Sequence, residues 1–216
     1  MIQIDKLIDD SEEDAETNPL MPKHPFRLLI SGESGCGKTN LLLNMILKYL
    51  SFDSLFVCAK DLQETSYQEL KEYYELLQEI PDLESYQTEF YDNLDDMKSV
   101  DELDDNSRNL IIFDDCITEK NQELIQDMFI RGRKKNASVV YITQSFYRVP
   151  KIIRDNSNYF IFFKLHLKEL KRVLKEIDGY DIPNLQLNPF DFFMLDRKNP
   201  KLKFRKNFDP IKSLSV

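Results

Sequence analysis

The sequence is poor in the residues that mark several classes of protein. Its three cysteines, Cys36, Cys58 and Cys116, lie far apart, without the spacing of a metal site or the density of a disulfide-bonded secreted fold. No run of residues approaches the ~18 consecutive apolar positions of a membrane span, and the N-terminus is acidic where a signal peptide would be basic and then apolar. These absences predict a soluble, intracellular protein of a reducing compartment, with no membrane span.

A uniform positive charge is also missing, since the formal net charge is -9 at pH 7. The charge is unevenly distributed along the chain. Residues 61–105 contain 16 Asp and Glu against two Lys, whereas residues 131–206 contain 18 Lys and Arg against seven Asp and Glu. The composition therefore argues against a protein that coats nucleic acid with its whole surface, and it indicates a dipolar molecule with one basic part.

The length of 216 residues and the hydrophobic content of 42% suffice for one well-enclosed core. Residues 1–24 are rich in Asp and Glu, and prolines follow at Pro19, Pro22 and Pro25. Such a composition favours a chain without regular structure. We therefore expect a flexible acidic leader over residues 1–24 and a single domain over residues 25–216.

Apolar segments of strand length alternate with segments of helical period along this domain. The strand candidates are residues 26–31, 54–58, 110–113, 138–143 and 159–163, and the helix candidates are residues 41–49, 64–80 and 123–130. Residues 82–105 read as an irregular acidic connection with one short strand at 88–91, and residues 190–195 and 202–205 as a closing β-hairpin. The alternation predicts an α/β fold with a mainly parallel sheet, helices on both faces, a C-terminal β-hairpin and a ligand site beyond the carboxyl ends of the strands.

A complete phosphate-binding loop follows the first of these strands. It matches G-x-x-x-x-G-K-[ST] with Gly32, Glu33, Ser34, Gly35, Cys36, Gly37, Lys38 and Thr39. Three of the chain's five glycines lie in this segment, which argues against a chance match on an ordinary turn. Glycines let backbone N–H groups turn toward an anion, and the start of a helix adds partial positive charge. We expect these residues and Asn40 to bind the nucleotide. Lys38, in a solvent-facing loop, would reach the terminal phosphates, and Thr39 would ligate Mg²⁺.

Two adjacent carboxylates, Asp114 and Asp115, end the apolar strand candidate at 110–113. Opposite a phosphate-binding loop, an acid at the end of a strand can hold the water shell of Mg²⁺, and we assign this role to Asp114. Asp115 stands where many ATPases have a glutamate that polarises the attacking water. Asp115 is the predicted general base. It would act directly, from a position closer to the attacking water, or through another water. In a sequence without a phosphate-binding loop, the same pattern would indicate only a strand that enters a turn.

Two further features surround the strand candidate at 138–143. Gln144 follows it and could sense the γ-phosphate or orient the attacking water, the ordinary alternative being a turn residue. The basic run Arg131-Gly132-Arg133-Lys134-Lys135 precedes it. One arginine of this run could reach the nucleotide of a neighbouring subunit and stabilise transition-state charge. The run could equally complement the dipole at the end of a helix.

The segments GESGCGKT, LIIFDDC and RGRKKNASVVYITQS, in this order, resemble the genome-packaging ATPases of the FtsK-HerA superfamily found in poxviruses, giant viruses and virophages. The resemblance covers roughly residues 26–163 and implies a RecA-like core in which the strand before Gln144 lies between the strands that lead to the phosphate-binding loop and to Asp114. It also implies that Asp115 is the catalytic acid, that Gln144 is the sensor, and that Arg133, with Arg131 next, acts in a neighbouring subunit.

This resemblance implies an ATP-hydrolysing translocase that packages a double-stranded DNA viral genome. ATP and Mg²⁺ would be its cofactors, and a homo-oligomeric ring, a pentamer or hexamer, would pass double-stranded DNA through its pore without reading the bases. Viral capsid or membrane vertex proteins are the expected partners, and the host cytoplasm, a virus factory or the virion the expected location.

Two alternatives remain. A small P-loop nucleotide or metabolite kinase shares the loop and the sheet, although the acidic residues 61–105 would repel a phosphorylated acceptor. A nucleotide-dependent assembly factor with negligible hydrolysis is the other alternative.

Overall fold

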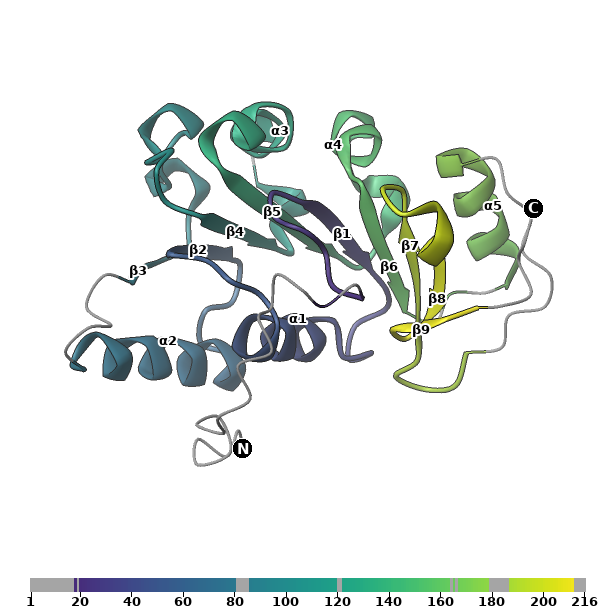
Figure 1. The fold of residues 1–216 in the computed structure, drawn as a ribbon, viewed down its shortest axis with the longest axis horizontal. Helices are drawn as coiled ribbons and strands as arrows, with labels where there is room; N and C mark the ends of the chain where they lie inside the picture. Colours follow the sequence, from purple (N-terminus) through teal and green to yellow (C-terminus); the bar gives the residue numbers. More distant parts are fainter. Residues whose placement is uncertain are drawn as a thin grey trace.

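The computed structural model describes residues 18, 20–80, 86–119, 122–163, 165, 167–178 and 187–211. Within these ranges one nine-stranded sheet has the order β3-β2-β4-β5-β1-β6-β7-β8-β9 (Figure 1). Its parallel part consists of β1 (Arg27–Ser31), β2 (Ser54–Ala59), β3 (Gln87–Tyr91), β4 (Asn109–Asp114), β5 (Ala137–Thr143) and β6 (Tyr159–Phe163). The predicted α/β fold with a mainly parallel sheet is confirmed.

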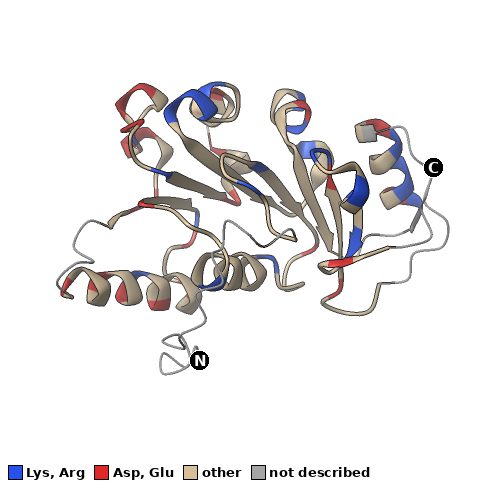
Figure 2. Cartoon of the chain, viewed as in Figure 1, with Lys and Arg blue, Asp and Glu red and all other residues tan. Residues whose placement is uncertain are grey.

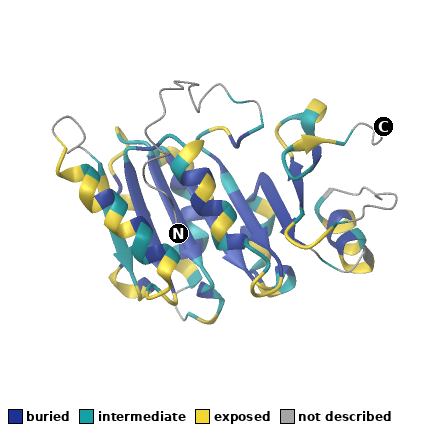
Figure 3. Cartoon of the chain, turned by 90° about the horizontal axis from the view of Figure 1, so that it is seen from below, coloured by how far each residue is buried: buried dark blue, intermediate teal, exposed yellow. Residues whose placement is uncertain are grey.

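Helices cover both faces of the sheet, which explains why its central strands β2, β4, β5 and β6 are mainly apolar. On β1, Leu28 and Ile30 belong to one core cluster and Leu29 to the other. Figure 3 shows the central strands buried and the helices exposed along their outer sides. One face is covered by α1 (Lys38–Lys48) and α2 (Thr65–Gln78), the other by α3 (Gln122–Arg131), α4 (Lys151–Asn156) and α5 (Leu167–Asp178).

The antiparallel end of the sheet contains the predicted C-terminal hairpin, formed by β7 (Phe192–Asp196) and β8 (Phe204–Lys206), together with a short strand β9 (Asp209–Pro210). Arg205 on β8 is fully buried and lies 2.5 Å from the Asp196 carboxylate on β7. The Arg205 guanidinium also donates to the carbonyls of Leu202 and Leu20. A buried arginine needs such partners, because an unpaired charge would be costly to desolvate. Arg205 thus joins the hairpin to the segment that precedes β1.

The described residues of the segment before β1 pack on the domain. Met21 is 5% exposed and belongs to the core. The His24 ring lies 3.0 Å from Asn136 Oδ1 and 2.7 Å from Ser138 Oγ, next to the start of β5.

Residues 1–17 and 19, which make up most of the expected leader, lie outside the described residues. Among the described helices, none is long and apolar enough to span a bilayer.

The strand order places β5 between β1 and β4, as the resemblance implies. The register aligns Ser31 with Thr143, and Asp114 with Ile142. Because the strands are parallel, their carboxyl ends meet at one edge of the sheet. This edge brings together the phosphate-binding loop, Asp115 and Gln144, although they are far apart in the sequence.

Candidate active site

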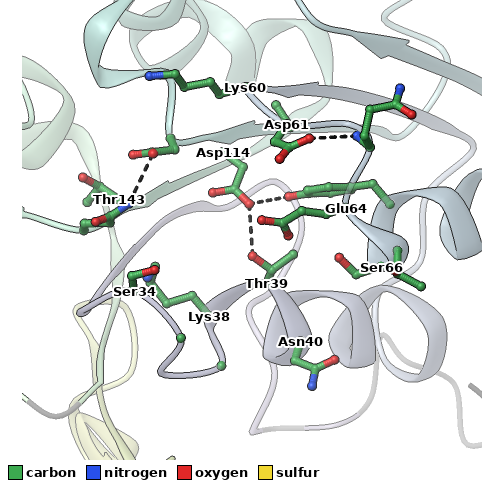
Figure 4. A pocket seen from close by; sticks show the side chains of 18 residues that line it. Ser34, Lys38, Thr39, Asn40, Lys60, Asp61, Glu64, Ser66, Asp114 and Thr143 are labelled. Atoms are coloured by element: carbon green, nitrogen blue, oxygen red, sulfur yellow. Dashed lines mark hydrogen bonds between the residues drawn. The ribbon is translucent and has the colours of Figure 1, made fainter. Parts of the chain in front are cut away.

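A cavity of about 1100 Å³ opens at the carboxyl ends of β1, β2, β4 and β5. Figure 4 shows side chains from these different elements converging on it. Its lining comprises Ser34, Gly35, Gly37, Lys38, Thr39, Asn40, Ala59, Lys60, Asp61, Gln63, Glu64, Thr65, Ser66, Tyr67, Asp114, Asp115, Thr143 and Gln144. The structure therefore brings together most of the predicted nucleotide contacts, both aspartates and Gln144. Gly32, Glu33 and Cys36 belong to the loop but do not line the cavity.

Two glycines give the phosphate-binding loop its shape. Gly37 precedes α1 with φ 97°, a left-handed conformation that glycine adopts without steric cost. Gly32 lies against β6, where an added Cβ would be 2.6 Å from Phe163 Cβ and 2.9 Å from Cys36 Sγ. The loop therefore turns directly into the N-terminus of α1, whose free N–H groups favour an anion such as a phosphate.

Lys38, the first residue of α1, is buried, although Glu33, Ser34 and Gly35 in the loop before it are exposed. The residue is 9% exposed, and its Nζ donates to the carbonyls of Gly32 and Glu33 at 2.8 Å each. A buried ammonium needs these acceptors because burial without hydrogen bonds is costly. The positive charge is thereby held inside the curve of the loop, next to the cavity where phosphates would bind.

Thr39 and Asp114 lie next to each other, as a Mg²⁺ site requires. Thr39 Oγ1 donates to Asp114 Oδ2 at 3.1 Å, across from the end of β4 (Figure 4). Burial raises the pKa of the Asp114 carboxyl, and the hydrogen bonds from Tyr67 and Thr39 oppose this shift. A hydroxyl and a carboxylate beside a phosphate site are the oxygen ligands that suit Mg²⁺. The residues present therefore fit the ion, and Thr39 and Asp114 would hold it.

Asp115 and Gln144 lie beside each other at the ends of neighbouring strands. Gln144 Nε2 donates to Asp115 Oδ2 at 3.3 Å. Asp115 has φ 52°, a left-handed conformation that Asp and Asn adopt more readily than most residues. This bend turns the chain away from the strand immediately after Asp114. A carboxylate and an amide at one point of the cavity can together accept a proton from a water molecule and orient it.

Tyr67 on α2 belongs to the site, although the sequence predicted only a helix over residues 64–80 at this position. Its hydroxyl donates to Asp114 Oδ2 at 2.5 Å, and the residue is 2% exposed. Burial, followed by the nearby Asp114 charge, raises the pKa of the Tyr67 phenol, so it remains a donor. The same carboxylate oxygen, Asp114 Oδ2, thus accepts hydrogen bonds from two hydroxyls, those of Thr39 and Tyr67. The one signal for this contact in the sequence is the hydroxyl of a tyrosine at a helical position that otherwise takes apolar residues.

We expect Tyr67→Phe to raise the Mg²⁺ concentration that nucleotide binding requires. Phenylalanine keeps the buried ring but removes one of the two donors that orient Asp114. A hydrogen bond to a charged group contributes about 1.5–3 kcal/mol, so roughly tenfold more Mg²⁺ should be needed for the same binding of a fluorescent ATP analogue. Binding in excess EDTA should be unchanged. Tyr74→Phe, a buried ring two turns further along α2, is the control, and equal behaviour of the two variants would refute the role of the Tyr67 hydroxyl.

The segment after β2 forms the wall of the cavity opposite the phosphate-binding loop. It contributes Lys60, Asp61, Gln63 and Glu64 ahead of α2. Nothing in the spacing of these residues matches a nucleotide-binding motif, so the sequence did not indicate them. Their position follows from the parallel pairing of β2 with β4, which aligns Ala59 with Asp114.

The structure does not bring the predicted arginine to the cavity of its own subunit. Arg133 lies in the 3-10 turn Gly132–Lys135, which directly precedes β5 and therefore lies at the amino edge of the sheet, opposite Gln144. Its side chain is exposed. Arg131, the second candidate, donates to Asp127 at 2.7 Å and forms an ion pair with Asp101. Among the described residues, Arg131 thus forms ion pairs with two carboxylates and Arg133 with none.

The comparisons with solved structures show the same fold. The genome packaging NTPase B204 from Sulfolobus turreted icosahedral virus 2 in complex with AMP has a TM-score of 0.58 at 14% identity, over 88% of this chain and 100% of that chain. B204 from Sulfolobus Turreted Icosahedral Virus, described as a DNA-packaging ATPase, has a TM-score of 0.56 at 16% identity, over 85% and 97%. EssC (ATPases 2 and 3) from Geobacillus thermodenitrificans has a TM-score of 0.57 at 10% identity, over 89% and 41%.

Sequence comparison is more specific. No curated protein matches the chain. A family profile described as "Poxvirus A32 protein" matches residues 15–181, a range that contains the phosphate-binding loop, both aspartates, Gln144 and the parallel part of the sheet. The predicted family is thereby confirmed: the chain belongs to the poxvirus A32 protein family.

Proposed function

We propose that this chain is the ATP-hydrolysing motor that packages a double-stranded DNA viral genome. The observation that carries the proposal is the convergence of Lys38, Thr39, Asp114, Asp115 and Gln144 on one cavity at the carboxyl edge of a parallel sheet. Membership of the A32 family and the shared fold with B204, which is described as a genome packaging NTPase, support it. B204 was also solved with ATP-gammaS and AMPPCP, which supports a nucleoside triphosphate as the ligand.

Each of these five residues has a role that its geometry suits. The loop amides and the N-terminus of α1 bind the phosphates, and Lys38 neutralises the charge that develops on them. Thr39 and Asp114 hold Mg²⁺, which when bound screens the phosphate oxygens. Asp115 accepts a proton from the attacking water, and Gln144, which donates to Asp115 at 3.3 Å, orients that water.

Arg133 cannot act on the nucleotide of its own subunit, because it lies at the amino edge of the sheet. In a homo-oligomeric ring, each interface joins two different surfaces, one from each subunit. We assign Arg133 to the site of the neighbouring subunit, where a positive charge stabilises the transition state of phosphoryl transfer. A pentamer or a hexamer would satisfy this geometry.

The charge distribution suits a motor that grips DNA without reading its sequence. Figure 2 shows acidic residues along α2 and basic residues along α5. Contacts to phosphates are independent of sequence and need positive potential only where DNA lies. The basic end of the sheet would face the pore and the acidic end the outside. Capsid or membrane vertex proteins would be the partners during assembly in the infected cell.

Phosphate release in the presence and absence of double-stranded DNA tests this function. We expect DNA of any sequence to stimulate release several-fold, by the charge-based contacts described above, with decreasing effect as salt increases. A rate of phosphate release that is the same with and without DNA would contradict the proposal of a motor and would favour an assembly factor. Radiolabelled phosphate that appears on a small-molecule acceptor instead of in solution would indicate a kinase.

A further inference from the structure

Three cations from distant parts of the sequence meet at the amino edge of the sheet. They are Arg27, the first residue of β1, Arg133 in the turn before β5, and Lys198 in the loop after β7. Arg27 Nη1 donates to the Phe129 carbonyl at 3.0 Å, and Lys198 Nζ donates to the Pro25 carbonyl at 3.1 Å. Among the described residues, none of the ion pairs includes any of these three cations.

Local contacts hold the three cations around one short segment. The turn that carries Arg133 ends at Asn136, whose Oδ1 lies 3.0 Å from His24 Nε2. The next residue, Pro25, accepts the hydrogen bond from Lys198, and Arg27 follows two positions later. We call Arg27, Arg133 and Lys198 the amino-edge cation cluster.

The charges in this cluster repel one another. Burial lowers the pKa of Arg27, and Arg133 lowers it further. Partial burial lowers the pKa of Lys198, which stays exposed at the surface, followed by Arg27 and Arg133, whereas Asp196 raises it. Asp196 is itself 2.5 Å from the buried guanidinium of Arg205. Its charge is therefore already paired with Arg205 and is not a dedicated counterion for the cluster. A group of like charges without its own counterion is stabilised by a bound anion.

The nucleotide cavity has the opposite character and lies at the opposite edge of the same sheet. Its lining includes Asp61, Glu64, Asp114 and Asp115 against Lys38 and Lys60, and a bound triphosphate would add further negative charge. Two different, complementary surfaces at opposite edges are what a head-to-tail assembly of identical subunits requires. A second copy of this chain is therefore the partner that fits both surfaces.

We propose that the amino-edge cation cluster faces the triphosphate held in the nucleotide cavity of a second copy of this chain and stabilises the charge that develops on it during hydrolysis, with Lys198 as a second catalytic cation beside Arg133. Arg133 and Lys198 are both exposed and can reach a neighbour. Arg27 is held by the Phe129 carbonyl and by Asn156 Oδ1 at 3.4 Å, so it contributes a fixed positive charge behind them. This inference rests on the proposed function, because it requires the ring.

Lys198→Ala tests the assignment, with Lys201→Ala as the matched control from the same loop. We expect Lys198→Ala to lower phosphate release without DNA roughly tenfold or more, on the scale of one lost electrostatic contact in the transition state, while binding of a fluorescent ATP analogue and the melting temperature stay unchanged. Lys201→Ala should behave as wild type, and Lys198→Arg should retain most of the activity because it keeps the charge.

Mixing subunits shows whether Lys198 acts across an interface. A Lys198→Ala subunit has an intact cavity, and a Lys38→Ala subunit has an intact cation cluster, so a mixed assembly contains complete sites and should regain activity. Mixed oligomers that stay as inactive as the single variants would overturn the proposal. So would a defect that appears only with DNA together with weakened DNA binding, because Lys198 would then contact DNA phosphates. The loss and the recovery of activity are read from phosphate release without DNA, so a motor that fails to respond to DNA is a separate result.

Discussion

Lys38→Ala should abolish ATP hydrolysis while leaving the α/β fold intact. Lys38 provides the charge inside the curve of the phosphate-binding loop, and its loss removes a contact that strengthens as charge develops in the transition state. The loss of one such donor lowers turnover by roughly 10²–10³, so phosphate release should fall to the background. ATP binding should weaken as well, because the carbonyls of Gly32 and Glu33 lose their 2.8 Å donor. Wild-type turnover in this variant would contradict the assignment of the loop.

Asp115→Asn is the comparison that separates binding from chemistry. Asparagine has the same shape as aspartate and also tolerates the left-handed backbone seen at φ 52°, so the bend after β4 should persist. Mg-ATP binding should be retained while turnover falls by roughly 10², the scale of a lost general base. If Mg-ATP binding disappeared instead, Asp115 would be a metal ligand and Asp114 the base.

Arg133→Ala should be nearly inactive although its own nucleotide cavity is untouched. The side chain is exposed and lies at the edge of the sheet opposite the cavity, so ATP binding and the melting temperature should equal those of the wild type. Arginines that act on a neighbour's nucleotide contribute about 10³–10⁵ in rate. Lys134→Ala, at an exposed neighbouring position of the same turn, is the control and should keep wild-type turnover.

A mixture of Arg133→Ala and Lys38→Ala subunits makes this test specific. Some interfaces then pair an intact loop on one subunit with an intact Arg133 on the next, and part of the activity should return. If gel filtration shows mixed oligomers and the mixture stays inactive, Arg133 does not act across the interface. Arg131 and Arg154 would be the next candidates, although Arg131 already pairs with Asp127 and Asp101, and Arg154 with Glu176, in their own subunit.

The sequence was most informative where periodicity and local chemistry agree. Continuous apolar runs such as residues 138–143 and 159–163 correctly predicted buried parallel strands, because both faces of the sheet are covered. The phosphate-binding loop, Asp114 and Gln144 could be placed at one edge, since each follows a strand and parallel strands share their carboxyl ends. The order of β4, β5 and β1 came from the family resemblance alone, because local patterns do not determine which strands are neighbours.

The features that the sequence did not indicate depend on distant contacts. The Tyr67 hydroxyl finds its partner Asp114 47 residues away, and nothing in the local pattern of α2 predicts that meeting. Lys38 is buried because the loop folds its own carbonyls around the ammonium. The amino-edge cation cluster depends on β7 and β8 extending the sheet beside β6, which brings the loop with Lys198 next to the segment before β1.

The most direct test of the motor is DNA translocation itself. A double-stranded DNA with a third strand bound in its major groove would be incubated with assembled protein, ATP and Mg²⁺, and release of the third strand would be followed by fluorescence. The wild-type protein should displace the third strand only when ATP is hydrolysed, regardless of DNA sequence, and Lys38→Ala should leave it bound. Wild-type protein that hydrolyses ATP on this DNA but never displaces the third strand would contradict the proposal of a packaging motor.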